Sequence, residues 1–332
     1  MKHTIYFNGD VGIKDTFTIA GPKEGEGPLA NYFHNVLRDD ILGQKSHEKA
    51  EILMMKSAIK NILNRTDYTT EDIDCVFAGD LLDEITSSNF AMREFPIPFI
   101  GLFNACATFC SALIMGAIMI TGGYAKRVIC ATSSHFGTVE RQYRYPLELG
   151  AQRTPLNQWT VTGAGCTLLE GGEDHRVKLT AATIGKVVDY GVTDSNDMGA
   201  AMTPAAMDTW ITHFTETGRK PSYYDAIYTG DLGHAGSRLL KKLMLKEGYD
   251  LEGIYDDCGA LIFNREAQKV GQGGSGTGCS NLVFNSYIYS QMMSGRLKRV
   301  LFVPTGALLS RITPLQGESI PGIAHAVALE VK

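Results

Sequence analysis

The chain has 332 residues, of which 44% are hydrophobic and 20% are charged, a composition typical of globular proteins and not of disordered or fibrous ones. Its formal net charge is −5 and no block of Lys and Arg stands out, which argues against nucleic acid as a partner. No signal peptide is expected, because no apolar segment follows a basic start. The longest apolar stretch, Ala105–Ile120, is shorter than the roughly 20 residues of a membrane span, so any membrane association should be peripheral.

Helical periodicities and short apolar runs alternate along the chain. Residues 46–64 carry apolar side chains near helical spacing, which predicts an amphipathic helix. Ala107–Thr121 is apolar nearly all round, which predicts a helix enclosed on every side, and Ala205–Thr217 is the expected counterpart of the first helix. Four short apolar runs are expected to be strands buried on both faces: Cys75–Ala78, Val128–Ala131, Ala226–Thr229 and Val300–Val303.

Three segments recur in the same order, which predicts two related halves, residues 1–172 and 173–332. EDIDCVFAGDLLDE (71–84) matches YYDAIYTGDLGHAG (223–236), each reading Asp, strand, Gly-Asp-Leu. Each half then has an apolar helix, a glycine stop, a Lys-Arg pair and an apolar strand, with Arg127 corresponding to Arg299. VTGAGCTLLE and GIAHAVALE end on Glu170 and Glu330. Each half should form a mixed sheet with right-handed crossovers.

These features resemble the thiolase superfamily, and ketoacyl synthase III in particular. Longer segments, among them AGPKEGEGPL, FNACATFC, RQYRYPLELGAQ and ESIPGIAH, resemble the stage V sporulation protein AD family almost from end to end. The resemblance implies an α/β thiolase-like duplicated fold, with two mixed sheets and shared central helices in αβαβα layers.

The resemblance also implies a function. Members of that family bind dipicolinic acid (pyridine-2,6-dicarboxylate) as part of a spore inner-membrane complex that moves it, with calcium, during sporulation and germination. The expected partners are therefore dipicolinic acid, the other subunits of that complex and a second copy in a homodimer. The sequence by itself suggests a cytoplasmic protein, and the resemblance places it peripherally on the spore inner membrane.

Cys106 is the strongest candidate for a site residue. It is expected at a strand-to-helix junction, where the free N–H groups of the first helical turn favour a thiolate or a bound anion. By resemblance it stands where condensing enzymes carry their nucleophile. The alternative is a small buried cysteine that only fills space.

The resemblance implies that the residues which would assist such a cysteine in catalysis have been replaced in this chain. Ketoacyl synthase III also uses a His and an Asn, and alignment places Gly230 or Asp231 at the His position and Ser275, or a neighbouring Gly, at the Asn position. We therefore expect a binding protein in which Cys106 lines the pocket. The alternatives are a condensing or acyl-transfer enzyme that uses Cys106, and a structural dimer that docks other subunits.

Four more residues are candidate ligand contacts. His325 lies in the C-terminal hairpin and is expected to partner Cys106 or the ligand, the alternative being a core histidine. His135, Arg141 and Arg144 lie in a Tyr-rich segment with the chemistry to bind a flat dicarboxylate, or alternatively to form a dimer contact.

No cofactor or metal site is expected. The seven cysteines form no CxxC pair, no His/Cys cluster has zinc spacing and no EF-hand pattern occurs. VGQGGSGTGCS lacks the GxxxxGK[ST] pattern of a nucleotide-binding loop. The cysteines are therefore expected to be free thiols in a reducing compartment.

Overall fold

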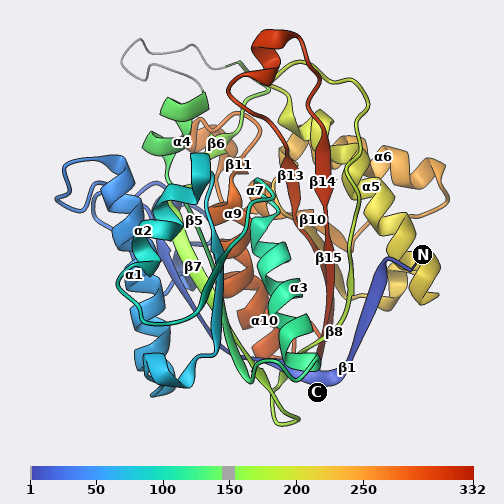
Figure 1. Ribbon diagram of the computed structural model, residues 1–332. Coiled ribbons are helices and arrows are strands. Elements are labelled where there is room, and N and C mark those ends of the chain that lie inside the picture. Colours follow the sequence, from blue (N-terminus) through green and yellow to red (C-terminus); the bar gives the residue numbers. More distant parts are fainter. Residues whose placement is uncertain (1, 144–153) are drawn as a thin grey trace.

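The computed structural model describes residues 2–143 and 154–332, and within them eleven strands form one mixed sheet (Figure 1). All four predicted strands are present; Ala226–Thr229 has the predicted bounds, and the other three are longer by one to four residues. The first half contributes β1 (Thr4–Ala20), β3 (Cys75–Gly79), β4 (Phe99–Gly101), β5 (Arg127–Ser134) and β7 (Gly163–Gly171). The second half contributes β8 (Val177–Thr183), β9 (Ala226–Thr229), β10 (Tyr255–Asp257), β12 (Arg299–Val303) and β15 (Ala326–Val331).

The two halves have the same strand order and the same strand directions. The first reads β4-β3-β5-β7-β1 and the second β10-β9-β12-β15-β8, each with two parallel pairings followed by two antiparallel ones. The strands of the two halves form one continuous sheet, because β1 pairs with β8 near its start and with β7 over its later part. β2 (Asn35–Val36) adds a short parallel pairing to β1.

Helices separate and cover the two halves of the sheet (Figure 1). α3 (Thr108–Thr121) lies at the centre beside α9 (Thr277–Val283), the π-helical turn η7 (Phe284–Ile288) and α10 (Tyr289–Met293). α1 (His47–Thr66) and α2 (Thr86–Met92) cover the outer face of the first half, and α5 (Met198–Thr217) and α6 (Gly233–Lys246) that of the second.

Three hydrophobic cores correspond to these layers. The central core joins α3 and α9 to the inward faces of both half-sheets, and its aromatic centre is formed by Phe109, Phe284 and Phe302. The two outer cores lie under α1 and under α5. Successive strand residues alternate between an inner and an outer core, as period-two side chains require. The predicted αβαβα layering is confirmed.

Local capping explains where the long helices begin. α1 starts after Ser46, whose hydroxyl accepts the backbone N–H of Lys49. α5 is longer than the predicted Ala205–Thr217, because Asp197 caps it seven residues earlier by accepting the N–H of Ala200. Pro204 lies inside the helix.

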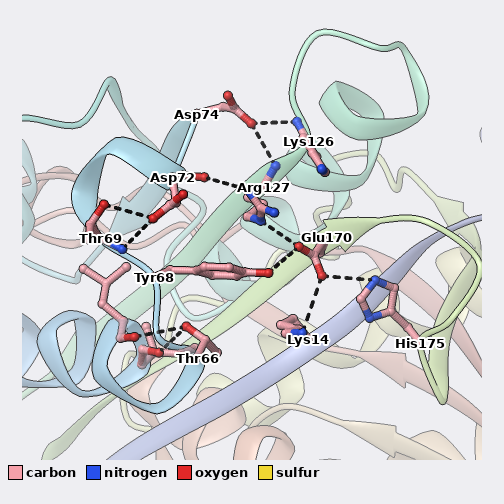
Figure 2. A network of polar contacts seen from close by, with 12 residues as sticks. Lys14, Thr66, Tyr68, Thr69, Asp72, Asp74, Lys126, Arg127, Glu170 and His175 are labelled. Carbon is pink, nitrogen blue, oxygen red and sulfur yellow. Dashed lines mark hydrogen bonds and ion pairs between the residues drawn. The ribbon is translucent and has the colours of Figure 1, made fainter.

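The Lys-Arg pair of each half fixes the beginning of a strand. One carboxylate oxygen of Asp74 accepts the backbone N–H groups of Lys126 and Arg127, at 2.7 and 2.9 Å (Figure 2). Asp225 accepts those of Lys298 and Arg299 at the same two distances. We call these the two aspartate clamps.

A glutamate at the end of the neighbouring strand completes each arrangement. Arg127 and Tyr68 both donate to Glu170, at 2.6 and 2.8 Å (Figure 2). Tyr223 donates in the same way to Glu330, at 3.0 Å. The duplicated sequence pattern is therefore a duplicated polar structure. It lies where β3 and β9 begin, at the opposite end of these strands from the pocket described next.

Candidate functional site

A pocket opens over Cys106, at the carboxyl ends of β3 and β9. Ligands commonly bind beyond the carboxyl ends of strands in α/β folds. The pocket has an empty volume of about 530 Å³, counting the open space at its mouth. Its walls are mostly apolar, and no Lys or Arg is among its described lining residues: Leu81, Ala105, Cys106, Val139, Glu140, Tyr143, Gln158, Thr160, Met198, Ser275, Ala307 and Leu309.

A strained turn positions Cys106. The preceding residue, Ala105, has a φ of 48°, in the left-handed region that costs a residue with a side chain about 1–2 kcal/mol. Thr108, the first residue of α3, stabilises the turn by donating its hydroxyl to the Ala105 carbonyl at 2.6 Å. Gly306 on β13 (Thr305–Ala307) packs against the turn so closely that a Cβ there would lie 2.5 Å from the Asn104 carbonyl. Such over-determined strain is characteristic of functional positions.

Asp231 lies beside the thiol. It follows β9, and its fully buried carboxylate accepts hydrogen bonds from the Ser275 hydroxyl and the Gly276 N–H, both at 3.0 Å. Its other oxygen accepts the Thr305 hydroxyl at 3.1 Å. The structure therefore brings together three of the residues predicted from sequence: Cys106, Asp231 and Ser275.

The pocket keeps Cys106 as a neutral thiol. Burial and, next, the charge of the adjacent Asp231 carboxylate raise the pKa of Cys106 well above its usual value, although the Gly276 N–H and the Ser275 hydroxyl act in the opposite direction. The expectation that the helix start would favour a thiolate is therefore corrected. Burial raises the pKa of Asp231 to about 6, and hydrogen bonds from its neighbours limit the rise.

His325 contacts the turn that carries Cys106 and does not line the pocket. It stands between β14 (Gly322–Ala324) and β15. Its Nδ1 accepts the backbone N–H of Gly185 at 3.1 Å, and its Nε2 lies 3.4 Å from the Asn104 amide. Burial lowers its pKa to about 4, so the ring is neutral at physiological pH. The ring is thus linked to the Cys106 turn through Asn104.

His135 and Arg141 face away from the pocket. His135 is buried, its Nδ1 accepts the Gly137 N–H at 2.9 Å, and its Nε2 lies 2.8 Å from the Asp40 carbonyl. Arg141 pairs with Glu48 on α1. Arg144 lies outside the described residues.

Helical geometry explains which residues of this segment reach the pocket. α4 (Phe136–Tyr143) turns Val139, Glu140 and Tyr143 toward the pocket, so Arg141 points to another side. Tyr143 lies four residues after Val139 and three after Glu140, so helical spacing relates it to both lining residues.

Two further polar residues of the site carried no sequence signal. Gln158 donates to the Asp231 carbonyl at 2.7 Å and to the Gly274 carbonyl at 2.9 Å. Thr160 donates to Glu140 at 3.3 Å. Both come from the segment around β6 (Trp159–Thr160), which pairs with β11 (Gly274–Ser275) far along the chain.

The described residues contain neither a metal-binding cluster nor a membrane-spanning helix. Across residues 2–143 and 154–332, no cluster of three or more His, Cys, Asp or Glu side chains is arranged to hold a metal ion. In the same ranges no helix combines the length and apolar character that crossing a membrane requires.

Comparison with known proteins relates this geometry to a family. The family model described as Stage V sporulation protein AD matches residues 1–330. The chain is 42% identical to the Stage V sporulation protein AD of Bacillus subtilis (strain 168) over 329 residues, which are 99% of this chain and 97% of that protein.

Solved structures with low sequence identity share the fold. An OleA variant from Xanthomonas campestris aligns with a TM-score of 0.63 at 14% identity, covering 97% of this chain and 99% of that one. The 3-oxoacyl-[acyl-carrier-protein] synthase III of Aquifex aeolicus VF5 aligns with a TM-score of 0.53 at 13% identity, covering 98% and 99%. The predicted thiolase-like fold is therefore confirmed.

Proposed function

The chain belongs to the Stage V sporulation protein AD family, and from that premise we propose that this sporulation protein binds dipicolinate in the pocket over Cys106 and does not catalyse condensation. In this proposal it acts within the spore inner-membrane complex that moves dipicolinate with calcium. It is peripheral to the membrane and held there by other subunits.

The observation that carries the non-catalytic part is the Asp231 carboxylate beside the Cys106 thiol. A condensing enzyme needs a thiolate nucleophile, and donors that stabilise negative charge as it develops in the transition state. Here burial and, next, the charge of the carboxylate beside the sulfur raise the pKa of the thiol, and that carboxylate repels a developing anion. The Ser275 hydroxyl and the Gly276 N–H both donate to that carboxylate.

The pocket suits a flat ring with polar edges. Leu81, Val139 and Leu309 supply apolar walls for the pyridine ring, and Tyr143 and Ser275 supply polar atoms nearby. Two carboxylates need compensating charge, and the described lining contains no Lys or Arg. We therefore expect the ligand to bind more tightly together with calcium, whose charge offsets that of both ligand and pocket.

Titration calorimetry of dipicolinate into the whole protein, with and without calcium, tests this function. Leu309→Trp should block binding by filling the pocket. Leu315→Trp is the matched control, because Leu315 is 88% exposed and does not line the pocket. The proposal fails if the wild type binds no dipicolinate under either condition, or if both variants bind like the wild type.

The specific case for an enzyme is the retained cysteine on its strained turn, in a fold shared with condensing enzymes. Incubation with acyl-CoA followed by mass spectrometry of the Cys106 peptide distinguishes the two functions. We expect no acylation at neutral pH. Acylation with turnover would establish the enzyme instead.

We also propose that the protein is a homodimer joined through β4. This strand ends the sheet, and Ile100 and Phe103 on and beside it are each nearly half exposed. β10 is its counterpart at the opposite end, where the exposed residue is the charged Asp256. Apolar side chains on an open edge invite pairing, and charge discourages it. Two copies of β4 related by a twofold axis would pair antiparallel.

Light scattering after size exclusion tests the dimer. Ile100→Asp should produce monomers, whereas Leu245→Asp, at an exposed apolar position of α6, should leave the mass unchanged. A monomeric wild type, or a dimer unaffected by Ile100→Asp, would contradict this interface.

A further inference from the structure

The two halves have hollows in corresponding places, one lined by acidic side chains and the other mainly by basic ones. In the first half, the hollow between the start of α2 and the end of β4 is lined by Asp83, Glu84 and apolar residues. In the second half, the corresponding hollow lies between α6 and β10, and β10 is the strand at the other end of the sheet. Its lining consists of His234, Ser237, Arg238, Lys241, Tyr255, Asp256, Ala260 and Leu261.

The basic side chains of the second hollow come from one face of α6. His234, Arg238 and Lys241 are four and three residues apart, so successive turns of the helix present them on the same side. Arg265 lies close enough that its charge helps to lower the pKa of His234, after the larger effect of burial. Asp256 is the only acidic residue of the lining.

Strong ion pairs within the described part of the chain do not neutralise the charges of Arg238 and Lys241. Arg238 makes no ion pair or hydrogen bond with another residue in the described part of the chain. The Nζ of Lys241 lies 5.7 Å from the centre of the Tyr255 ring and 4.0 Å from Glu252, a glutamate that is 84% exposed. Pairs of this kind contribute little to stability. The Ser237 hydroxyl is buried and forms no hydrogen bond of normal geometry. It lies near Tyr255, where it limits the rise that burial causes in the pKa of that tyrosine.

We propose that this hollow, which we call the α6 site, binds the phosphate group of a small phosphate ester. Arg238 and Lys241 would supply the charge and Ser237 a hydroxyl donor. The hollow has an empty volume of about 830 Å³ including its mouth, and Leu261 and Ala260 provide an apolar wall for the rest of the ester. Arg in particular matches the oxygen geometry of phosphate. This site is separate from the pocket over Cys106 and does not depend on the function proposed for that pocket.

Calorimetric titration of the whole protein with phenyl phosphate tests the α6 site. We expect saturable binding that Arg238→Gln combined with Lys241→Gln weakens by about tenfold or more. Lys242→Gln is the matched control, because Lys242 is exposed on α6 outside the hollow. Leu309→Trp should leave phenyl phosphate binding unchanged. Thermal unfolding verifies that the variants are folded.

A second experiment identifies whether the phosphate belongs to a lipid headgroup or to a soluble ester. Vesicles of phosphatidylglycerol, compared with phosphatidylcholine, test a lipid headgroup. Binding to phosphatidylglycerol that the double variant loses would support the site with a lipid as its ligand. The proposal is overturned if the wild type binds neither probe, or if Lys242→Gln weakens binding as much as the double variant.

Discussion

Asp231 is the residue that most changes the chemistry expected of this site. A carboxylate that accepts hydrogen bonds from Ser275, Gly276 and Thr305 is held rigidly, and the thiol of Cys106 lies next to it. Burial of both groups keeps their interaction strong, because solvent does not screen it. The reactivity of Cys106 is therefore determined by its neighbour as much as by its place at a helix start.

Asp231→Asn should make Cys106 more reactive. Removing the negative charge lowers the pKa of the thiol and raises the thiolate fraction about tenfold for each pKa unit. Alkylation by iodoacetamide at pH 8, followed by mass spectrometry of the Cys106 peptide, measures the rate. Cys110, buried one turn further along the chain, is the internal control and should stay unreactive. An unchanged or slower rate at Cys106 would show that Asp231 does not suppress the thiolate.

At the scale of elements, a buried glutamate joins α1 to β5 and α4. Glu51 accepts the Ser133 hydroxyl at 2.9 Å and the Thr138 hydroxyl at 2.8 Å, and it is fully buried. Burial, followed by the nearby Asp80 carboxyl, raises the pKa of Glu51 to about 8. The glutamate is therefore held largely protonated at neutral pH, which allows α4 to pack closely on α1.

The pH dependence of stability follows from that raised pKa. Glu51 binds its proton more tightly in the folded protein than in the unfolded chain. Its contribution to stability is therefore complete below about pH 4.5 and is lost as the pH rises to about 8. The loss should be of the order of a few kcal/mol.

Glu51→Gln should remove much of this dependence. The new amide resembles the protonated acid, and Thr138 can accept from it because its hydroxyl can donate to the His135 carbonyl instead. Urea unfolding between pH 5 and pH 9 should show a flatter profile for the variant and higher stability than the wild type at the alkaline end. Parallel profiles for the two proteins would refute the role assigned to Glu51.

At the scale of the whole molecule, the two halves share the same arrangement where their strands begin and differ at the carboxyl ends of those strands. The aspartate clamps recur with matching distances because each half needs the same anchor where its strand begins. The carboxyl ends of the strands differ: Asp80 follows β3 and accepts from Ser88 and Leu82, whereas Asp231 follows β9 and faces the thiol. The shared frame leaves these ends free to differ in function.

The two clamps should contribute independently. Asp74→Ala and Asp225→Ala each remove the acceptor of two backbone N–H groups at the start of a strand. These hydrogen bonds are exposed, so water replaces the acceptor in part, and each variant should lose about 0.5–1.5 kcal/mol. The clamps lie in different halves, so the double variant should lose the sum. The Asn variants, which keep a side-chain oxygen, should lose less. Chemical denaturation measures all of these; a double variant no less stable than either single one would contradict independence.

Much of the fold could be predicted because its signals are local or repeated. Short continuous apolar runs mark the strands, and a helix as apolar as Ala107–Thr121 has to be enclosed by other elements. The expected range Ala205–Thr217 was too short for α5, because the cap at Asp197 lies upstream of that range. Part of the site was also accessible: Asp231 and Ser275 meet Cys106 as the resemblance to ketoacyl synthase III implies.

The sequence by itself determined the duplication, the layered α/β architecture and the family, because these depend on patterns that neighbouring residues carry together. Only the tertiary structure decided which side chains share the pocket. Arg141 turns toward α1 and not toward Cys106, His325 contacts Asn104, and Gln158 arrives from a distant segment. It also decided that Cys106 is a thiol. Protonation depends on burial and on charges brought close by folding, and residues 106 and 231 become neighbours only when the two halves pack together.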